Sequence, residues 1–263
     1  MTLKIATWNV NSIKVRLPHL LKWLPQAAPD VVLLQETKVV DSAFPTAEIN
    51  DLGYNVLAVG QRGYNGVAVL SRHSIEPLRN ALPDDGDATD THARYVEAVT
   101  GGLHVASVYL PNGNPLGTDK FAYKLLWMER LYRHVQDLLE SEVPFVLAGD
   151  YNVAPDDRDV HDPDAFKGDA ICQPAARAAF RKILYLGVID AIRALKSDPG
   201  LYTYWDYQRG GFAADRGIRI DHLLLSPQAA DRLEETAIDK TPRGWDRPSD
   251  HAPVWCTLNS APP

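Results

Sequence analysis

Cysteine is scarce in this chain of 263 residues, whose two cysteines, Cys172 and Cys256, lie far apart and near no pair of histidines. This pattern excludes a zinc ribbon and argues against a disulfide framework. Long apolar runs are also missing: none approaches the roughly 18 residues that a membrane span needs, and the N-terminus does not read as a secretory signal. We therefore expect a reducing, cytoplasmic setting and no membrane partner.

Positive charge is in short supply, because 27 Lys and Arg stand against 34 Asp and Glu, for a formal net charge of −7. Such a chain is not expected to coat nucleic acid in bulk. It would bind nucleic acid through a local basic or polar surface, or through an acidic site that recruits a divalent cation. With 45% hydrophobic and 23% charged residues, it has the composition of a globular protein with a sizeable core.

The pattern of apolar residues predicts an α/β fold rich in strands. We find no internal repeat, low-complexity tract or long linker, and we expect one domain over residues 1–263. Several of the strand-like runs are continuously apolar, which predicts strands covered on at least one face. The predicted strands are 3–9, 30–36, 54–59, 66–72, 94–100, 103–110, 144–150, 220–226 and 252–258.

Helical patterns lie between these strands. Apolar steps of three and four residues predict a helix from Thr118 to Glu140, and prolines mark the start of a shorter helix at Pro18 and of a third over about 174–186. The long acidic loops 83–93 and 154–173 are of a kind that often carries function. The faces expected to be buried are Leu20, Leu21 and Leu24 in the short helix and Phe121, Leu125, Met128, Tyr132, Val135 and Leu139 in the long one.

Polar side chains gather where the predicted strands end or begin. Taken singly, each could serve a turn, a helix cap or a solvated strand end. Asp221 is harder to explain in this way, because a carboxylate that enters an apolar strand is costly unless it is paired. The set consists of Asn9, Glu36, Tyr109, Asn112, Asp150, Asn152, Asp221, Asp250 and His251.

Together these residues suit the metal-assisted hydrolysis of a phosphodiester. Mg²⁺ prefers oxygen ligands and is typically held by one or two carboxylates plus substrate phosphate, so Glu36 is a candidate ligand with Asn9 and Asp250 as helpers. Asp150 could orient and deprotonate a water, and Asn152 could place that water or the phosphate. His251 could stabilise the negative charge that develops on the phosphate, and Asp221 would hold the histidine protonated. Asp150 and His251 can both be drawn as the general base.

Seven segments resemble, in order and spacing, the exodeoxyribonuclease III and abasic-site endonuclease group of the endonuclease/exonuclease/phosphatase superfamily. The resemblance runs from about residue 3 to residue 258. The segments are TWNVNS (7–12), LLQETK (33–38), GVAVLSR (66–72), VYLPNG (108–113), LAGDYNVAP (147–155), RGIRIDHLL (216–224) and PSDHAPV (248–254).

The resemblance implies a four-layer α/β sandwich of two packed, mainly antiparallel sheets with helices outside. It implies a nuclease dependent on Mg²⁺, with Mn²⁺ as a substitute, that acts on damaged double-stranded DNA. Such an enzyme cleaves 5′ to abasic sites, degrades duplex DNA from 3′ ends and removes 3′-blocking groups. Residue by residue, Glu36, Asn9 and Asp250 resemble the metal site, Asp150 the group that activates water, and Asn152 and His251 the phosphate contacts. Asp221 resembles the carboxylate behind the histidine, Tyr109 and Asn112 resemble phosphate-side contacts, and Tyr109 would lie near the leaving group.

The segment 202–221 bears on the substrate, because it interleaves aromatic side chains with Arg209, Arg216 and Arg219. That mixture is expected where a protein holds a DNA backbone and an unstacked sugar or base. A hairpin packed on the core is the structural alternative. The resemblance places Tyr204, Trp205, Ile218 and Ile220 in a pocket for an abasic deoxyribose, and the substrate-binding set predicted here is Asn112, Tyr204, Trp205, Phe212, Ile218, Arg219 and Ile220.

Three residues depart from the family pattern. Ile218 stands where some abasic endonucleases carry tryptophan, which leaves the pocket shape and the balance of activities open. Asn11 replaces an aspartate of some relatives, and Tyr151 is bulkier than the usual aliphatic residue and is expected to point into the core. Two other functions remain to be considered: hydrolysis of another phosphodiester, such as RNA, an inositol phosphate or a phospholipid head group, and a silent DNA-binding scaffold. We expect a monomer.

Overall fold

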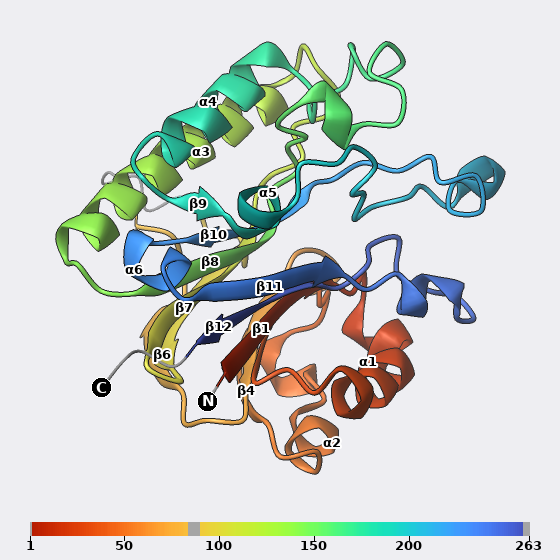
Figure 1. The fold of residues 1–263 in the computed structure, drawn as a ribbon. Coiled ribbons are helices and arrows are strands. Elements are labelled where there is room, and N and C mark those ends of the chain that lie inside the picture. The colour runs from red at the N-terminus through yellow and green to blue at the C-terminus, as the bar shows by residue number, and fades with distance from the viewer. Residues whose placement is uncertain (1, 84–89, 260–263) are drawn as a thin grey trace.

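The computed structural model describes residues 2–83 and 90–259, and within them two six-stranded sheets stack face to face (Figure 1). Helices cover the outer face of each sheet, with α1 and α2 on one side and α3 and α4 on the other (Figure 1). The four layers confirm the predicted α/β sandwich. Among the described residues, no helix is long and apolar enough to cross a membrane.

The first sheet has the strand order β11–β12–β1–β2–β4–β3, and β1 and β2 at its centre are parallel. The other neighbours in this sheet are antiparallel. Its strands are β1 (Thr2–Asn9), β2 (Val31–Gln35), β3 (Asn55–Val59), β4 (Val67–Ser71), β11 (Leu233–Ile238) and β12 (Val254–Asn259).

The second sheet repeats this plan in the order β5–β6–β7–β8–β10–β9, with β7 and β8 as its central parallel pair. The remaining neighbours are again antiparallel. Its strands are β5 (Glu76–Arg79), β6 (Tyr95–Thr100), β7 (Leu103–Tyr109), β8 (Phe145–Asp150), β9 (Ile189–Asp190) and β10 (Asp221–Leu225).

The helices join these strands across the outside of the sandwich. The α-helices are α1 (Ile13–Ala27), α2 (Thr46–Asn50), α3 (Asp119–Glu140), α4 (Pro174–Leu184), α5 (Ala191–Leu195) and α6 (Pro227–Ala230). Short 3₁₀ turns lie at Asp41–Ala43, Asp157–Asp159, Gln208–Gly210 and Thr241–Gly244.

The core between the sheets is built from the inward-facing residues of both, among them Leu33, Val69, Val105 and Val146. Buried polar bonds cross this apolar layer. Gln35 Nε2 donates to Ser107 Oγ at 2.9 Å, and Ser107 Oγ donates to the carbonyl of Leu34 at 2.7 Å. Because buried polar groups are costly when they are left unpaired, these bonds favour one alignment of the two sheets over slipped ones.

That alignment brings four strand ends to one edge of the sandwich. Asn9 lies opposite Gln35 in the parallel pair β1–β2, and Tyr109 lies opposite Asp150 in the pair β7–β8. Asp221, which begins β10, is opposite Asp150 on the other side. The carboxyl ends of parallel strands meet at one edge, so the predicted site residues at these ends are neighbours.

Two of the three predicted helices are confirmed, and the start of the third is wrong. Helices α3 and α4 match the patterns at 118–140 and 174–186, and the Thr118 hydroxyl caps α3 by accepting from the amide of Lys120. Helix α1 begins at Ile13 and carries Pro18 inside it. Packing of Ile13, Leu20 and Leu24 against the first sheet overrides the break that Pro18 suggests.

The buried face of α3 is rotated from the predicted one. Met128 and Val135 are buried as expected, whereas Leu125, Tyr132 and Leu139 are only partly buried. The residues that complete the inner face are Lys124, Trp127, Leu131, His134 and Leu138. A search for apolar residues at helical spacing cannot predict that a lysine and a histidine lie on the buried face.

Strands β5, β9 and β11 were not predicted, because β5 and β11 are largely exposed and β9 has two residues. The predicted loop 154–173 contains only a 3₁₀ turn and short turns. Residues 84–89 of the predicted loop 83–93 lie outside the described residues.

A buried cluster of charges ties the second sheet to the loop after β8. The Arg219 guanidinium donates from Nε to Asp159 Oδ1 and from Nη1 to Asp190 Oδ2, both at 2.7 Å. Arg193 and His222 supply further partners to these two carboxylates. Burial alone would raise the pKa of Asp159 and Asp190, but the Arg219 charge together with the hydrogen bonds and charges of Arg219, Arg193 and His222 outweighs it, and the pKa of both carboxyls is lowered.

We predict that Arg219→Met lowers the free energy of unfolding at pH 7 by about 3–5 kcal/mol, because it leaves buried carboxylates short of a counter-charge. Urea unfolding measures this change. Lys182→Met, which removes an exposed ion pair with Glu129, is the matched control and should cost less than about 1 kcal/mol. Equal stability of Arg219→Met and the wild type would contradict the prediction.

The same cluster predicts how stability depends on pH. Lowered folded pKa values mean that its stabilisation is fully present above the ordinary aspartate pKa of about 3.9 and is lost as the pH falls through the lower folded values. The free energy of unfolding of the wild type should therefore drop below about pH 4. The drop should be smaller in Arg219→Met, which a urea titration at a series of pH values can show.

Candidate active site

The site is centred on the side-chain amide of Asn9, at the end of β1. Its Nδ2 donates to Glu36 Oε1 at 2.8 Å and to Asp150 Oδ2 at 2.9 Å. Glu36 follows β2 in the first sheet, and Asp150 ends β8 in the second. One buried amide thus bridges two carboxylates that come from different sheets.

Glu36 reaches this position through an unusual backbone turn. Its φ is 51°, in the left-handed region that residues with long side chains rarely adopt. The turn is held because the Glu36 carbonyl accepts from the amide of Ser12 at 2.7 Å, at the start of α1. The other carboxylate oxygen, Oε2, lies 2.8 Å from Lys38 Nζ. Burial alone would raise the pKa of Glu36, but Lys38 and Asn9 lower it, so the carboxyl stays ionised.

Asp150 is almost fully buried, and both of its oxygens have partners. Oδ2 accepts from Asn9, and Oδ1 accepts from the backbone amide of Asn152 at 2.9 Å. Burial, together with the neighbouring charges of Asp221 and Glu36, raises the pKa of Asp150 to about 7, although His251 opposes this effect. A carboxyl group with a pKa in this range can take up a proton near neutral pH.

His251 and Asp221 form a buried pair beside Asp150. His251 Nδ1 lies 2.9 Å from Asp221 Oδ2, which also accepts from the Thr203 hydroxyl at 2.6 Å. The other ring nitrogen, Nε2, lies 3.8 Å from Asp150 Oδ2. Burial would lower the pKa of His251, but the charges of Asp221 and Asp150 raise it to about 10. The imidazole is therefore held in the charged form.

One group of described residues offers a set of atoms suited to a cation. Glu36 and Asp150 each offer a carboxylate oxygen, and a ring nitrogen of His251 lies with them, all within 4.8 Å of one another. Because the charged imidazole has no free lone pair, the carboxylates are the candidate ligands. Two carboxylates with a nearby amide suit a hard divalent ion. In the present orientation the Asn9 amide presents its nitrogen to the carboxylates, and its oxygen accepts from the backbone amide of Asn11.

Asp250 lies next to this group and is joined to it through Asn11. Asn11 Nδ2 donates to Asp250 Oδ1 at 2.9 Å, and Asn11 Oδ1 accepts from Lys38 Nζ at 2.5 Å. Asn11 thus links Asp250 to the lysine that pairs with Glu36. An aspartate at position 11 would pair with Lys38 but could not donate to Asp250.

Tyr109 and Asn112 approach the site from the end of β7. Burial, with the carboxylates of Glu36 and Asp150 close by, raises the pKa of Tyr109 well above its usual value, so the phenol keeps its proton. The Arg94 guanidinium lies 4.6 Å from the centre of the Tyr109 ring. Asn112 Nδ2 donates to Asn152 Oδ1 at 2.9 Å, which joins the loops after β7 and β8.

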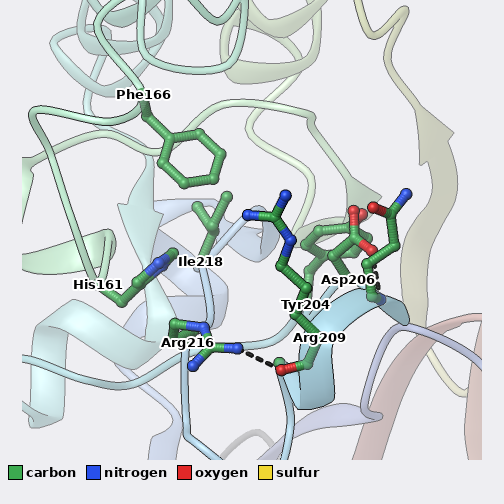
Figure 2. Close-up of a pocket in the computed structure, with 9 residues that line it drawn as sticks. His161, Phe166, Tyr204, Asp206, Arg209, Arg216 and Ile218 are labelled. Carbon is green, nitrogen blue, oxygen red and sulfur yellow. Dashed lines mark hydrogen bonds between the residues drawn. The ribbon is translucent and has the colours of Figure 1, made fainter.

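A pocket of about 360 Å³ adjoins the cluster (Figure 2). Tyr204 connects the two, because it lines the pocket and its ring packs on His251 with 5.0 Å between centroids. Ile218 and Phe166 lie side by side in one apolar cluster, the His161 ring packs edge-on against Phe166, and Arg216 donates to the carbonyl of Arg209 (Figure 2). The lining residues are His161, Phe166, Tyr204, Asp206, Gln208, Arg209, Gly211, Arg216 and Ile218.

Four predicted substrate-binding residues lie elsewhere. Trp205 is fully buried and donates from Nε1 to Asp215, with Phe212 packed edge-on against its ring at 5.2 Å. Ile220 is buried in the same segment, and the Arg219 guanidinium donates its hydrogen bonds to Asp159 and Asp190. The side chains of Trp205, Ile220 and Arg219 are enclosed by protein and are not free to contact DNA. For these three residues the structure supports the alternative interpretation of the segment, in which it packs on the core.

Several residues of the site were missed by the sequence analysis. Phe166 and His161 come from the loop after β8, which carries no recognisable motif, and only the fold brings them to Ile218. Lys38 is part of LLQETK, but nothing in the sequence apart from its charge indicates that it belongs to the site. Tyr151 is buried and packs on Phe180 and His222, as expected.

The comparisons with known proteins agree with this geometry. Residues 6–251 match the model of the endonuclease/exonuclease/phosphatase family. The chain is 33% identical to exodeoxyribonuclease III of Haemophilus influenzae, over 96% of this chain and 98% of that protein. An AP endonuclease structure from Archaeoglobus fulgidus superposes with a TM-score of 0.92 at 37% identity, covering 98% of this chain and all (100%) of that one. A 3′ phosphatase from Neisseria, bound to a product DNA hairpin, superposes with a TM-score of 0.94 at 37% identity and the same coverage.

The chain therefore belongs to the endonuclease/exonuclease/phosphatase family. Within it, the relatives place the chain in the exodeoxyribonuclease III and AP endonuclease group, whose members hydrolyse nucleic acid. This confirms the resemblance drawn from the seven segments and the expectation of a nuclease.

We predict that Asp221→Asn lowers the pKa of His251, because it removes the nearest negative charge while it leaves the ring buried. The imidazole signals can be followed by NMR against pH in metal-free buffer. Thr203→Val is the matched control, since it removes a hydrogen bond to Asp221 but leaves its charge, and should change the pKa less. An unchanged titration of His251 in Asp221→Asn would contradict the assigned pairing.

Proposed function

We propose that this chain is a divalent metal-dependent DNA phosphodiesterase of base-excision repair. It would cut duplex DNA 5′ to abasic sites, degrade it from 3′ ends and remove 3′-blocking groups by in-line attack of water. The observation that carries the proposal is the buried set of Glu36, Asn9, Asp150, His251 and Asp221, gathered from both sheets at one edge. We propose that the chain acts as a monomer.

The residues present fit a divalent cation of the hard kind, Mg²⁺ with Mn²⁺ as a substitute. Glu36 would be the main ligand, with Asp250 and Asn9 beside the ion. When bound, such an ion would neutralise charge on the phosphate and polarise its P–O bonds. Lys38 competes for Glu36 Oε2 and would exchange its ion pair for the metal.

The protein groups have separate roles in this proposal. Asp150 accepts the proton of the attacking water, for which its raised pKa suits it. The charged imidazole of His251 stabilises the negative charge that develops on the phosphate, and Asp221 keeps that ring charged and oriented. Asn152 Nδ2 uses one hydrogen for the carbonyl of Leu110 and has a second to donate to the phosphate. Asn112 and Tyr109 would contact the phosphate from the leaving-group side.

The pocket beside His251 would receive the sugar of a damaged nucleotide. Its apolar wall of Ile218 and Phe166 suits a ring or an unstacked sugar, and Arg209 and Arg216 at its mouth suit flanking phosphates. Because Tyr204 both lines the pocket and packs on His251, a nucleotide held there would present its 5′ phosphate near the catalytic pair. This arrangement favours DNA over a free phosphate ester.

If the chain is the proposed phosphodiesterase, we expect a single cut in a labelled duplex that contains one abasic-site analogue. With Mg²⁺ the cut should fall 5′ to the lesion, and excess chelator should abolish it. An undamaged duplex with a free 3′ end should give a ladder of shortened strands. Glu36→Gln should need more Mg²⁺ for the same rate, because it removes the charged ligand. Turnover that persists in chelator would contradict the metal site, and cleavage of an inositol phosphate or phospholipid but not DNA would contradict the substrate.

Phe166→Ala tests the pocket. We predict that it lowers cleavage at the abasic site by about 10- to 150-fold, the cost of a lost apolar contact with the sugar of about 1.5–3 kcal/mol, and affects 3′-end degradation less. Both rates are measured on matched duplexes. Tyr185→Ala removes an exposed aromatic side chain just after the C-terminal end of α4 and should leave both rates unchanged. Equal losses in the two reactions of Phe166→Ala would place the damaged nucleotide elsewhere.

A further inference from the structure

A lysine lies in the interior directly behind the candidate active site. Lys124, on the inner face of α3, is fully buried, and its Nζ donates to the backbone carbonyl of Asn112 at 2.9 Å and to that of Asn152 at 2.6 Å. Within residues 2–83 and 90–259, no carboxylate forms an ion pair with it. A buried ammonium that bonds only to carbonyls is an expensive feature for a fold to keep.

The two carbonyls belong to separate loops that both enter the site. Asn112 follows β7, and Asn152 follows β8. The side chains of the same two residues are also joined, because Asn112 Nδ2 donates to Asn152 Oδ1 at 2.9 Å. Lys124 therefore binds the backbone carbonyls of two asparagines whose side-chain amides are hydrogen-bonded to each other.

The backbone around both asparagines fits closely around this lysine. Asn152 has a φ of 48°, in the left-handed region that asparagine tolerates better than most residues. Gly113 has a φ of 92°, and a Cβ added there would lie 2.8 Å from Lys124 Cδ. The glycine in VYLPNG thus lets the loop after β7 pack on the lysine stem.

We propose that Lys124 is a positioning residue, whose ammonium holds the loops after β7 and β8 so that the amides of Asn112 and Asn152 face the scissile phosphate. This inference rests on the proposed function, since it takes these amides as phosphate contacts. Burial lowers the pKa of Lys124 to about 7, and the nearby carboxylate of Asp150 is the largest of the effects that oppose this shift.

The geometry separates this role from that of an ordinary core residue. A methionine could fill a similar volume, and removing the cost of burying the amino group offsets part of the cost of leaving two carbonyls without their donor. What methionine cannot supply is that donor. Small displacements of positioning groups cost catalysis steeply, so the loss of turnover should be larger than any loss of stability explains.

The first experiment compares Lys124→Met with the wild type on the duplex that the wild type cleaves. We expect kcat to fall by about 10- to 100-fold, with KM for DNA within about threefold and a melting temperature no lower than that of Met128→Ala. Met128→Ala, one turn along α3 and also buried, is the matched control. It should lower the melting temperature and leave kcat unchanged. A folded Lys124→Met with wild-type kcat would overturn the proposal, as would a loss of kcat that follows the melting temperature in both variants.

A double-mutant cycle tests whether Lys124 acts through Asn152. If it does, Lys124→Met introduced into Asn152→Ala should reduce kcat by less than about twofold, because the amide it positions is already gone. Full multiplication of the two losses would show that Lys124 acts independently of Asn152, which contradicts the proposal.

The proposed function and the role of Lys124 can fail separately. If the wild type cleaves no duplex, the phosphodiesterase proposal is overturned, and amide hydrogen exchange then decides the role of Lys124. Exchange of segments 110–114 and 150–154 should be faster in Lys124→Met than in Met128→Ala. Equal exchange in the two variants would show that the lysine does not hold these loops.

Discussion

The hydrogen bonds of Asn9 to Glu36 and Asp150 connect two sheets that share no backbone bond, and the site exists only where those sheets are stacked in register. Each sheet contributes the carboxyl ends of one parallel strand pair. A slip of one residue in either sheet would turn Asn9 or Asp150 toward the opposite face, because side chains alternate along a strand. The buried bonds of Gln35 and Ser107 oppose such a slip, so fold stability and site geometry depend on the same layer of contacts.

Burial then sets the electrostatics of the site. Glu36, Asp150 and His251 would titrate near their ordinary values in water, but within the sandwich burial and the charges of their neighbours shift the pKa of all three. Glu36 stays ionised because Lys38 faces it, and His251 stays charged because Asp221 faces it. Asp150 lies between these pairs, and its nearest cation, His251 Nε2, is 3.8 Å away, so burial prevails and the pKa of its carboxyl rises toward neutrality. The roles proposed for the three carboxyls follow from the positions of their cationic neighbours.

The sequence predicts this site well where chemistry lies in a contiguous motif at a strand end. Asn9, Glu36, Asp150, Asp221 and His251 each follow or begin an apolar run, and the structure brings them together. The pattern of residues 202–221 misled for a physical reason: Trp205, Arg219 and Ile220 have the types that bind nucleic acid, but also the types that stabilise a buried hairpin. Only packing tells the two apart. Phe166 and Lys124 were out of reach, since one lies in a loop without a motif and the other is a charge inside an apolar stripe.

The catalytic residues and the pocket residues lie on different segments of the chain, and a short ladder of backbone hydrogen bonds joins these segments. The amide of Trp205 donates to the carbonyl of Asp250, and the amide of Ala252 donates to the carbonyl of Thr203, so the pocket segment is hydrogen-bonded to both sides of His251. Arg243 strengthens the joint, because its guanidinium donates to the carbonyls of Trp205 and Ser249 and lies 4.9 Å from the Phe212 ring. Trp205 is therefore the inner support of the pocket, not its surface. Pocket residues outside this joint, such as the partly buried Phe166 and the exposed Arg209, can vary without disturbing it, which allows the damage recognised to change while the phosphate chemistry stays the same.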